Sequence, residues 1–440
     1  MADRWWRRRR TSDASKWNPV VGYPTGVLGH DWRALVTPSG DVVDADGTAL
    51  LRWFVAADDR WHRPADEVAV RQSNVAGSAV VETRLRVPGG DVVQTIWSAI
   101  ASNGRGYTVV EFANESSMPV AIAIAGDDVL TPRPVAPGEA PGLEPDEPVR
   151  VLPVAHRTNI SVLIAHDVRG AEWPSSWPTA DEVAAGWLAI ATRGGRVSVP
   201  EVIDGRPVDE IVMAARCRAA LEDPELIDDP IERLLSIDER RRMNLHDDDL
   251  EPMVVASVEQ VIAGLRKGSG DESATRLALT SANRLLQSDA RAAADLVAAV
   301  ARLKNDRAAT FPEAWGEVQA PGPLVDSGRR LSADLIDRVV RWTAPNTVTL
   351  MPDGLPRRWW GNSCEVFDVP AGPDHRISFA IRWHGERPAV LWEVVGPPGL
   401  ALRSGADEKW ATIDASGEAL WAAPSPVRIS MSVSSDQSFR

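Results

Sequence analysis

The residues best able to do acid–base chemistry lie in the acidic run 246–251, His-Asp-Asp-Asp-Leu-Glu. Crowded carboxylates raise one another's pKa, so two of them could act as a general acid and a general base. The run also comes directly before an apolar helical stripe that begins at Val254. Acids at such a position stabilise the positive end of a helix dipole, and this capping role is the favoured interpretation. The catalytic candidates in the run are Asp247, Asp248, Asp249 and Glu251.

A second group combines indoles with polar side chains in the segment 53–62, Trp-Phe-Val-Ala-Ala-Asp-Asp-Arg-Trp-His. Indoles stack on sugar rings and carboxylates accept hydrogen bonds from hydroxyls, so this segment suits a polyol. The alternative is that Asp58 and Asp59 form a turn with Arg60 as their ion-pair partner. Comparable indole patches are Trp173-Pro174, Trp177-Pro178 and Trp359-Trp360-Gly361. The ligand-binding candidates are Trp53, Asp58, Asp59, Trp61, His62, Trp359 and Trp360.

Sequence signatures of several other reaction classes are missing. The chain contains no GxxxxGK or GxGxxG loop, no HExxH pair, no GxSxG turn and no CxxC pair. The seven histidines are scattered without metal-ligand spacing. Cys217 and Cys364 are far apart in the chain, which indicates two reduced structural thiols rather than a disulfide framework. We therefore expect neither a metal nor a cofactor.

Composition indicates a globular chain of two or three domains. Its 440 residues are 44% apolar and 25% charged, and the net charge of −14 argues against a specific nucleic-acid partner. Residues 1–18 form a basic Trp/Arg-rich tail in which Arg7–Arg10 could contact an anionic surface, with a solvated chain end as the alternative. No signal-peptide pattern and no apolar stretch of about 20 residues is present, so we expect a cytoplasmic location and no transmembrane segment.

Residues 19–200 are expected to form a large antiparallel β-sandwich. Apolar and charged residues alternate over 81–87, which is typical of a half-buried strand. Similar runs at 94–100, 106–112 and 119–125 predict further antiparallel neighbours, and a strand follows at 160–165. The proline-rich stretch 132–148 is expected to be a surface loop. Thr179 and Glu182 then form a capping box that begins a short helix.

Residues 201–344 are expected to be a helical region. Apolar stripes at 208–219 and 254–265, the latter including Val255, predict two helices, and Gly268 is placed to cap the second. Helices at 273–287 and 290–304 would be joined by only two residues, which forces an αα-hairpin. After a loop over 312–328, Ser332 is expected to cap a last helix that runs through Trp342.

Residues 345–424 are expected to form a small antiparallel β domain, followed by a flexible tail at 425–440. Ile377, Phe379, Ile381 and Trp383 alternate with small or polar residues, and 384–388 form a turn into a partner strand. A two-stranded hairpin is marginal in water, so we expect these four side chains to pack on the last helix. The fold class is therefore α+β multidomain: a large β-sandwich, an αα-hairpin helical region and a small β domain.

Three segments carry a family resemblance: 57–62 (Ala-Asp-Asp-Arg-Trp-His), 86–91 (Arg-Val-Pro-Gly-Gly-Asp) and 378–393 (Ser-Phe-Ala-Ile-Arg-Trp-His-Gly-Glu-Arg-Pro-Ala-Val-Leu-Trp-Glu). With the order of domains, they resemble uncharacterised actinobacterial proteins related to glucoamylase-type six-hairpin (α/α)6 glycosidases and their flanking β domains. That resemblance implies a twelve-helix barrel, whereas region 206–343 offers five or six helices. The helical region therefore looks truncated, and no position here matches the catalytic glutamates of that family.

These observations lead to three functional hypotheses. The first is a non-catalytic, glycosidase-like protein that binds an oligosaccharide or a protein partner, since function resides in the site and not in the fold. The second is a glycoside hydrolase that acts on an intracellular or cell-wall glycan through a carboxylate pair about 5–9.5 Å apart. The third is a scaffold or interaction protein without a small-molecule ligand.

Overall fold

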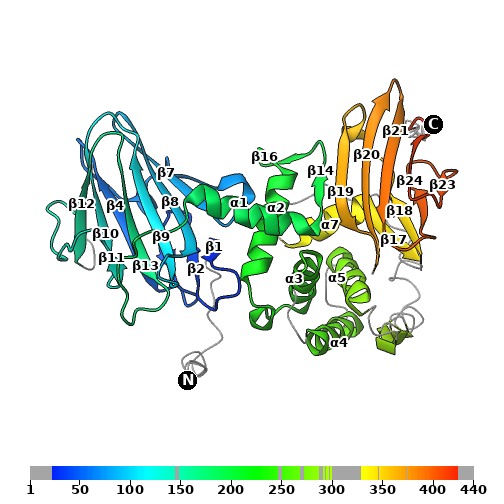
Figure 1. The fold of residues 1–440 in the computed structure, drawn as a ribbon, viewed down its shortest axis with the longest axis horizontal. Coiled ribbons are helices and arrows are strands. Elements are labelled where there is room, and N and C mark those ends of the chain that lie inside the picture. Colours follow the sequence, from blue (N-terminus) through cyan, green and yellow to red (C-terminus); the bar gives the residue numbers. More distant parts are fainter. Residues whose placement is uncertain are drawn as a thin grey trace, which may run out of the picture. The chain divides into compact units, whose positions relative to one another are not determined.

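The computed structural model of the chain describes residues 22–143, 148–245, 250–267, 272–286, 291–292, 294–296, 298–299, 329–344, 346–372 and 374–424. These residues form a multidomain α+β protein with a large β-rich region, several helices and several sheets (Figure 1). The chain divides into two compact units, Met1–Leu188 and Ala189–Arg440, which are described one at a time. None of the helices in the described part of the chain is both long and apolar enough to cross a membrane.

Two antiparallel sheets make up most of the first unit. In the first sheet the strand order is β1-β2-β3-β4-β10-β12, with β5 beside β4. Its strands are β1 (Tyr23–Gly26), β2 (Arg33–Val36), β3 (Val42–Val43), β4 (Ala49–Ala56), β5 (Trp61–His62), β10 (Val120–Ala125) and β12 (Val149–Val154). The second sheet has the order β11-β13-β9-β8-β7-β6. Its strands are β6 (Arg71–Asn74), β7 (Val81–Val87), β8 (Gly90–Ile100), β9 (Gly106–Asn114), β11 (Val129–Leu130) and β13 (Asn159–Ala165).

The two sheets share one apolar core, to which β4, β10 and β12 contribute from one side and β7, β8, β9 and β13 from the other. In β7 the apolar residues are buried and Arg86 is exposed, which confirms the alternation expected for 81–87. The strands expected at 94–100 and 106–112 are antiparallel neighbours, β8 and β9. The strand at 119–125 lies instead in the other sheet, between β4 and β12. Its alternation predicts a strand but carries no information about which strand it pairs with.

The outer face of the second sheet is covered by the start of helix α1 (Ala180–Ala191), whose Ala184 packs with Trp97, Tyr107 and Leu163. The capping box is present: the Thr179 N–H donates to Glu182 Oε2 at 2.8 Å, and the Glu182 N–H donates to Thr179 Oγ1 at 3.3 Å. Together these bonds satisfy two backbone donors at the helix start.

The described residues of the second unit include five helices. They are α2 (Val208–Leu221), α3 (Pro230–Arg242), α4 (Glu251–Lys267), α5 (Glu272–Leu285) and α7 (Arg329–Val339). The stripe expected on α2 is buried as a whole. On α4, Val254, Val258, Val261 and Ile262 are buried, but Val255 is exposed because it lies about 100° around the helix from Val254. Gly268, the link at 288–289 and the loop at 312–328 lie outside the described residues.

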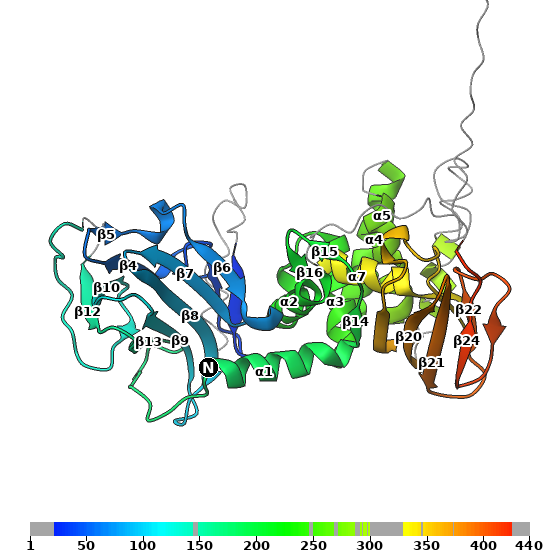
Figure 2. The ribbon, with the colours of Figure 1, turned by 90° about the horizontal axis from the view of Figure 1, so that it is seen from above.

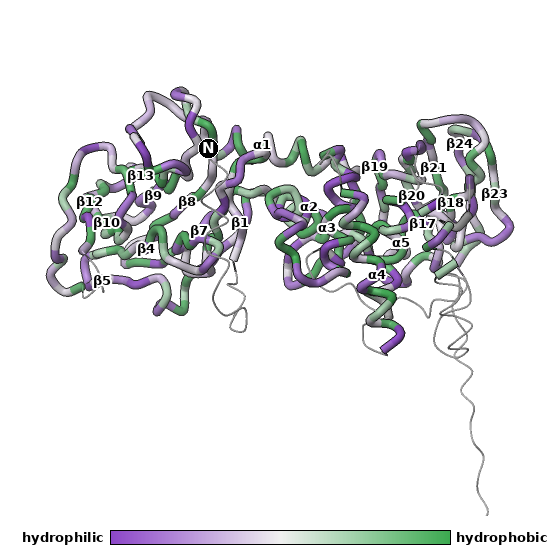
Figure 3. The backbone as a smooth tube through the Cα atoms, turned by 90° about the horizontal axis from the view of Figure 1, so that it is seen from below, coloured by the Kyte–Doolittle hydropathy of each residue, from purple (hydrophilic) through white to green (hydrophobic). Residues whose placement is uncertain are grey.

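Three small sheets complete this unit. The five-stranded sheet has the order β14-β19-β20-β21-β24, and its strands are β14 (Arg196–Ser198), β19 (Cys364–Pro370), β20 (Arg376–His384), β21 (Arg387–Val395) and β24 (Ser416–Leu420). The four-stranded sheet has the order β17-β18-β22-β23, and its strands are β17 (Val340–Ala344), β18 (Thr347–Leu350), β22 (Ala401–Ser404) and β23 (Ala411–Thr412). A third sheet pairs β15 (Val202–Ile203) with β16 (Arg206–Pro207). In Figure 3 hydrophobic and hydrophilic residues alternate along many of these strands.

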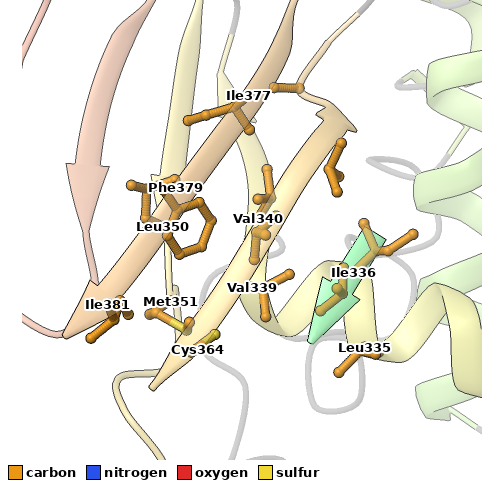
Figure 4. Packing of buried hydrophobic residues seen from close by; sticks show 14 of the residues in the cluster. Leu335, Ile336, Val339, Val340, Leu350, Met351, Cys364, Ile377, Phe379 and Ile381 are labelled. Carbon is orange, nitrogen blue, oxygen red and sulfur yellow. The ribbon is translucent and has the colours of Figure 1, made fainter. Parts of the chain in front are cut away.

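One core joins α2, α7 and both larger sheets of this unit. Ile377, Phe379 and Ile381 are 0, 3 and 1% exposed, and they share this cluster with residues 335, 336 and 339 of α7 (Figure 4). The expected inward direction is therefore confirmed for three of the four side chains, which enter a core that α7 also lines, while direct packing of the hairpin on this helix stays a prediction. The fourth, Trp383, is half-buried outside the cluster and donates its indole N–H to the Asn362 carbonyl at 2.8 Å. The helical region and the C-terminal strands thus share one core.

The last helix differs from the expectation at both ends. Ser332 is an interior residue of α7 and does not cap it, because its hydroxyl donates to the buried Glu239 Oε1 at 2.8 Å. The helix ends at Val339, and the chain continues directly into β17 instead of remaining helical through Trp342. Arg341 bonds both to Asp337 and to Asp353 beyond the strand, which holds this change of direction.

Candidate functional site

The acidic run provides one described candidate. Asp247, Asp248 and Asp249 lie outside the described residues, while Glu251 is exposed in the first turn of α4. A carboxylate there stabilises the positive end of the helix dipole. The geometry thus accounts for Glu251 as a helix-start acid, and a catalytic role for the run stays a prediction.

Strands β4 and β5 form a hairpin with Asp58 and Asp59 in its loop. The Ala57 N–H donates to the Arg60 carbonyl at 3.1 Å, which closes the turn, and both aspartates are exposed. Arg60 Nη2 lies 2.7 Å from Glu67 Oε1, while Arg60 Nε lies 4.0 Å from Asp59 Oδ2. The turn expected as the alternative interpretation is present, with Glu67 as the nearer partner of Arg60.

His62 is held between two carboxylates at this hairpin. Its imidazole is 4% exposed, with Nδ1 at 2.9 Å from Glu67 Oε1 and Nε2 at 3.0 Å from Asp59 Oδ1. The hydrogen bond from His62 lowers the pKa of the Asp59 carboxyl. Because both ring nitrogens are engaged within the protein, His62 has no free ring nitrogen to offer a ligand.

The four indoles selected from the sequence as ligand platforms all donate their N–H groups inside the protein. The bonds run from Trp53 to the Ser39 carbonyl (3.0 Å), from Trp61 to the Pro141 carbonyl (2.9 Å), from Trp359 to Glu201 Oε2 (3.1 Å) and from Trp360 to the Leu355 carbonyl (3.1 Å). Trp53 and Trp359 are only 0 and 2% exposed. These two rings therefore fill the cores of the two units and present no face to a ligand.

Trp173 is the most exposed indole among the described residues, at 36%. It lies on the loop between β13 and α1, and its ring stands edge-on to the ring of Trp177, with centroids 5.4 Å apart and an interplanar angle of 85°. No hydrogen bond from the Trp173 N–H occurs in the described part of the chain. Trp53, Trp61, Trp359 and Trp360 lack this combination of an exposed ring and an available donor.

The loop that carries Trp173 is fixed by the turn between β8 and β9. Three residues in or next to this turn donate hydrogen bonds to backbone carbonyls of the loop on both sides of Trp173. The bonds are Arg105 to the Arg169 and Gly170 carbonyls (2.8 and 2.7 Å), Tyr107 to the Glu172 carbonyl (2.8 Å) and the Ser102 N–H to the Ser176 carbonyl (3.0 Å). Trp97 also donates to the Pro178 carbonyl at 2.9 Å. A loop that is already ordered loses little conformational entropy when a ligand binds to it.

A buried ion network joins the helices of the second unit, and sequence reasoning did not find it. Asp238 Oδ2 accepts from Arg242 Nε at 3.1 Å, from Arg284 Nη2 at 2.5 Å and from the Ser281 hydroxyl at 3.0 Å. Burial alone would raise the pKa of the Asp238 carboxyl, but Arg242 and Arg284 lower it to about 2. The next residue, Glu239, pairs with the fully buried Arg216 at 3.1 Å. The sequence signal for this network was weak: charged residues such as Asp238, Glu239 and Arg242 follow the apolar residues of α3 at helical spacing.

The same network also connects α2 to the preceding chain. The Arg216 guanidinium donates to the carbonyls of Ala191 (3.2 Å), Gly194 (3.1 Å) and Gly195. Together with the Glu239 pair, these bonds tie α2 to α3 and to the residues before β14.

His166 ends a chain of buried hydroxyls in the first unit. Its Nε2 lies 3.1 Å from Thr108 Oγ1, which contacts Ser98 Oγ at 2.7 Å, and Ser98 contacts Thr25 Oγ1 at 2.8 Å. The Trp32 ring lies parallel to the imidazole, with centroids 3.9 Å apart. Nδ1 is buried without a hydrogen-bond partner among the described residues.

This environment favours the neutral imidazole. Burial lowers the pKa of His166 to about 3, and the nearby charges of His30 and Arg33 act in the same direction. A neutral ring can donate from Nε2 to Thr108 and leave Nδ1 bare, whereas a protonated ring would bury an unpaired N–H.

The His166 pKa predicts a loss of stability in mild acid. Below the unfolded pKa of 6.5 the unfolded chain binds a proton that the folded chain binds only near pH 3, so stability falls as pH falls through this window. Between pH 7.5 and 4.5 the loss attributable to His166 should be about 2.5–3 kcal/mol. Urea denaturation of wild type and His166→Gln across this range measures it, and the variant should show the flatter curve. The exposed His384→Gln is the control, and equal slopes for wild type and His166→Gln would contradict the assignment.

Comparisons with known proteins give no family. No family model matches the chain, and no curated protein matches it. Among solved structures, one described as "Putative kojibiose phosphorylase from human microbiome" matches with 8% sequence identity, covers 91% of each chain and has a TM-score of 0.34. At this identity and TM-score, the likeness assigns neither a family nor an activity to this chain.

Proposed function

We propose that this chain is a non-catalytic, glycosidase-like protein that binds a carbohydrate on a platform formed by Trp173 and Trp177. The observation that carries the proposal is Trp173: an indole at 36% exposure, on a loop fixed by its neighbours, with no partner for its N–H in the described residues. The other candidate indoles use their N–H groups within the fold. This distinction favours the Trp173 and Trp177 pair over the other indole patches that the sequence offered.

The platform has the chemistry that a sugar requires. An indole face covers the apolar C–H side of a pyranose, and its N–H donates to a ring or hydroxyl oxygen. The side chain of Glu172, next to Trp173, is exposed, and its carboxylate accepts hydrogen bonds from hydroxyls. Trp177 stands at a right angle to Trp173, so the two rings form a corner rather than a flat surface.

Isothermal titration of the full chain against malto-oligosaccharides and cell-wall glycan fragments tests this proposal. Trp173→Ala should weaken binding of the best panel member at least about tenfold, which corresponds to about 1.4 kcal/mol. Trp360→Ala is the matched control, because Trp360 is a half-buried indole that the sequence selected and whose N–H is already bonded. Absence of heat with every glycan would refute the carbohydrate proposal, and equal weakening by Trp360→Ala would move the site to that residue.

Hydrolysis is the less favoured function because the described candidate carboxylates have other contacts or positions. Asp59 bonds to His62, and Glu251 lies at the start of a helix. The proposal therefore predicts no turnover of chromogenic glycosides by the wild type. If the wild type releases the chromophore and an Asp247→Asn, Asp248→Asn or Glu251→Gln variant does not, the chain is a hydrolase instead. We also keep the cytoplasmic location and the contact of Arg7–Arg10 with anionic surfaces as parts of the proposal.

A further inference from the structure

The five-stranded sheet of the second unit buries one face and exposes the other. Residues that alternate with the buried ones of β19, β20, β21 and β24 point outward. On this outer face Phe367, Leu391, Val395 and Leu420 are 60, 45, 61 and 45% exposed. Single exposed apolar residues are ordinary on a protein surface, but several on one sheet face mark a candidate interaction site.

Strand β24 is the last strand of this sheet, beside β21 (Figures 1 and 2). The Trp421 N–H donates to the Pro388 carbonyl at 2.9 Å, and the Val394 N–H donates to the Ala415 carbonyl at 2.6 Å. Bonding alternates along an antiparallel strand, so the backbone groups of Ser416 and Glu418 point away from β21. No strand within the described residues pairs with this side of β24. The edge therefore offers a template for one more strand.

Acidic and apolar side chains lie along the middle of this edge, and at its Leu420 end Arg387 donates to the Leu420 and Trp421 carbonyls at 2.8 and 2.9 Å. Across β21 and β24, Leu391 lies opposite Glu418, and Glu393 lies opposite Ser416. Glu365, on the same face but farther from the edge, is neutralised by Arg382. Within the described part of the chain, no ion pair neutralises Glu393 or Glu418. The edge thus combines two uncompensated carboxylates with two exposed leucines, Leu391 and Leu420.

We propose that β24 and the outer face beside it bind an extended segment of a partner protein in which basic and apolar residues alternate. The segment adds to β24 as a sixth strand, and its backbone bonds to the outward N–H and C=O groups of Ser416 and Glu418. Its lysines or arginines lie near Glu393 and Glu418, and its apolar residues cover Leu391 and Leu420. A second copy of this chain is a poorer occupant, because its own β24 would bring another Glu418 to an acidic edge.

The probe for this site is an acetylated and amidated peptide of about seven residues in which lysine and valine alternate. Fluorescence anisotropy with the full chain should show saturable binding, and a peptide with glutamate in place of lysine should bind at least about tenfold more weakly. The double variant Glu393→Lys/Glu418→Lys should reverse this preference. Glu386→Lys is the control, since it makes one Glu-to-Lys exchange at an exposed acid in the β20–β21 turn and should leave binding unchanged.

Ser416→Pro separates strand addition from simple charge attraction. It removes an outward N–H that β21 does not use and leaves both glutamates in place. It should weaken the lysine peptide at least about tenfold. Unchanged binding in this variant would overturn strand addition, as would failure of the lysine peptide to bind at all. A wild-type dimer in sedimentation that Ser416→Pro dissociates would assign the edge to a second copy and overturn the proposed occupant. If Ser416→Pro fails to fold, a lysine peptide with N-methylated backbone amides takes its place, because it keeps the charges but cannot add as a strand, and unchanged binding of that peptide would overturn strand addition.

Discussion

Replacing Phe379 with alanine should lower the free energy of unfolding of the second unit by about 3–5 kcal/mol, the usual cost of emptying a buried phenylalanine site. The ring is 3% exposed, and its strand neighbours across β20 are Val366 on one side and Trp392 on the other. Both neighbours belong to the same core cluster, so the cavity opens inside that core. Urea denaturation of the full chain, followed through the transition of the second unit, measures the loss.

The control for this prediction is Arg382→Ala on the opposite face of the same strand. Arg382 is exposed and pairs with the exposed Glu365, an arrangement that contributes under about 1 kcal/mol. Similar losses for the two variants would mean that the register of β20 is shifted by one residue, since such a shift exchanges the buried and exposed faces.

Replacing Asp238 with asparagine should cost about 3–5 kcal/mol, because it leaves buried arginines without their counter-charge. Asp238 is 3% exposed and accepts bonds from Arg242, Arg284 and Ser281. The side-chain shape is kept, so the loss reports the charge rather than a cavity. Denaturation at pH 7 measures it, with Glu365→Gln, which removes one partner of the exposed pair with Arg382, as the control.

The acid side of the stability curve gives a second readout of Asp238. Its folded pKa of about 2 lies below its ordinary value of 3.8, so its contribution is present above pH 4 and is lost as the pH falls toward 2. That part amounts to about 2 kcal/mol. In Asp238→Asn this part of the acid-side loss should be absent. An unchanged acid curve together with a small loss at pH 7 would contradict the network.

Much of the element content could be predicted from the sequence because periodicity is a local signal. The alternation in 81–87, the capping box at Thr179 and the hairpin at 377–395 all depend on neighbours within a few residues. Pairing between distant strands is not determined by such local neighbours, so the place of β10 in the other sheet could not be predicted. The end of α7 was missed for the same reason, since the bond from Arg341 to Asp353 lies beyond the helix.

The site was harder to predict than the fold because the use of an indole depends on its surroundings. Trp53, Trp61, Trp359 and Trp360 have the residue types that a sugar site needs, yet each N–H is taken up by a partner up to 158 positions away. Trp173 has the same chemistry in the sequence and differs only in exposure and in the bonds that fix its loop. The ion network around Asp238 was missed because charged residues are read as solvated unless their partners are known.

The most direct test of carbohydrate binding at Trp173 is the indole N–H spectrum of tryptophan-labelled protein during titration with the best glycan of the panel. The Trp173 signal is assigned by its loss in Trp173→Phe. Binding on the platform predicts that this signal shifts with the ligand and saturates, while the Trp53 and Trp359 signals, from buried N–H groups bonded within the protein, stay in place. A saturating shift of the Trp360 signal with Trp173 unmoved, or no indole shift at ligand saturation, would contradict the account.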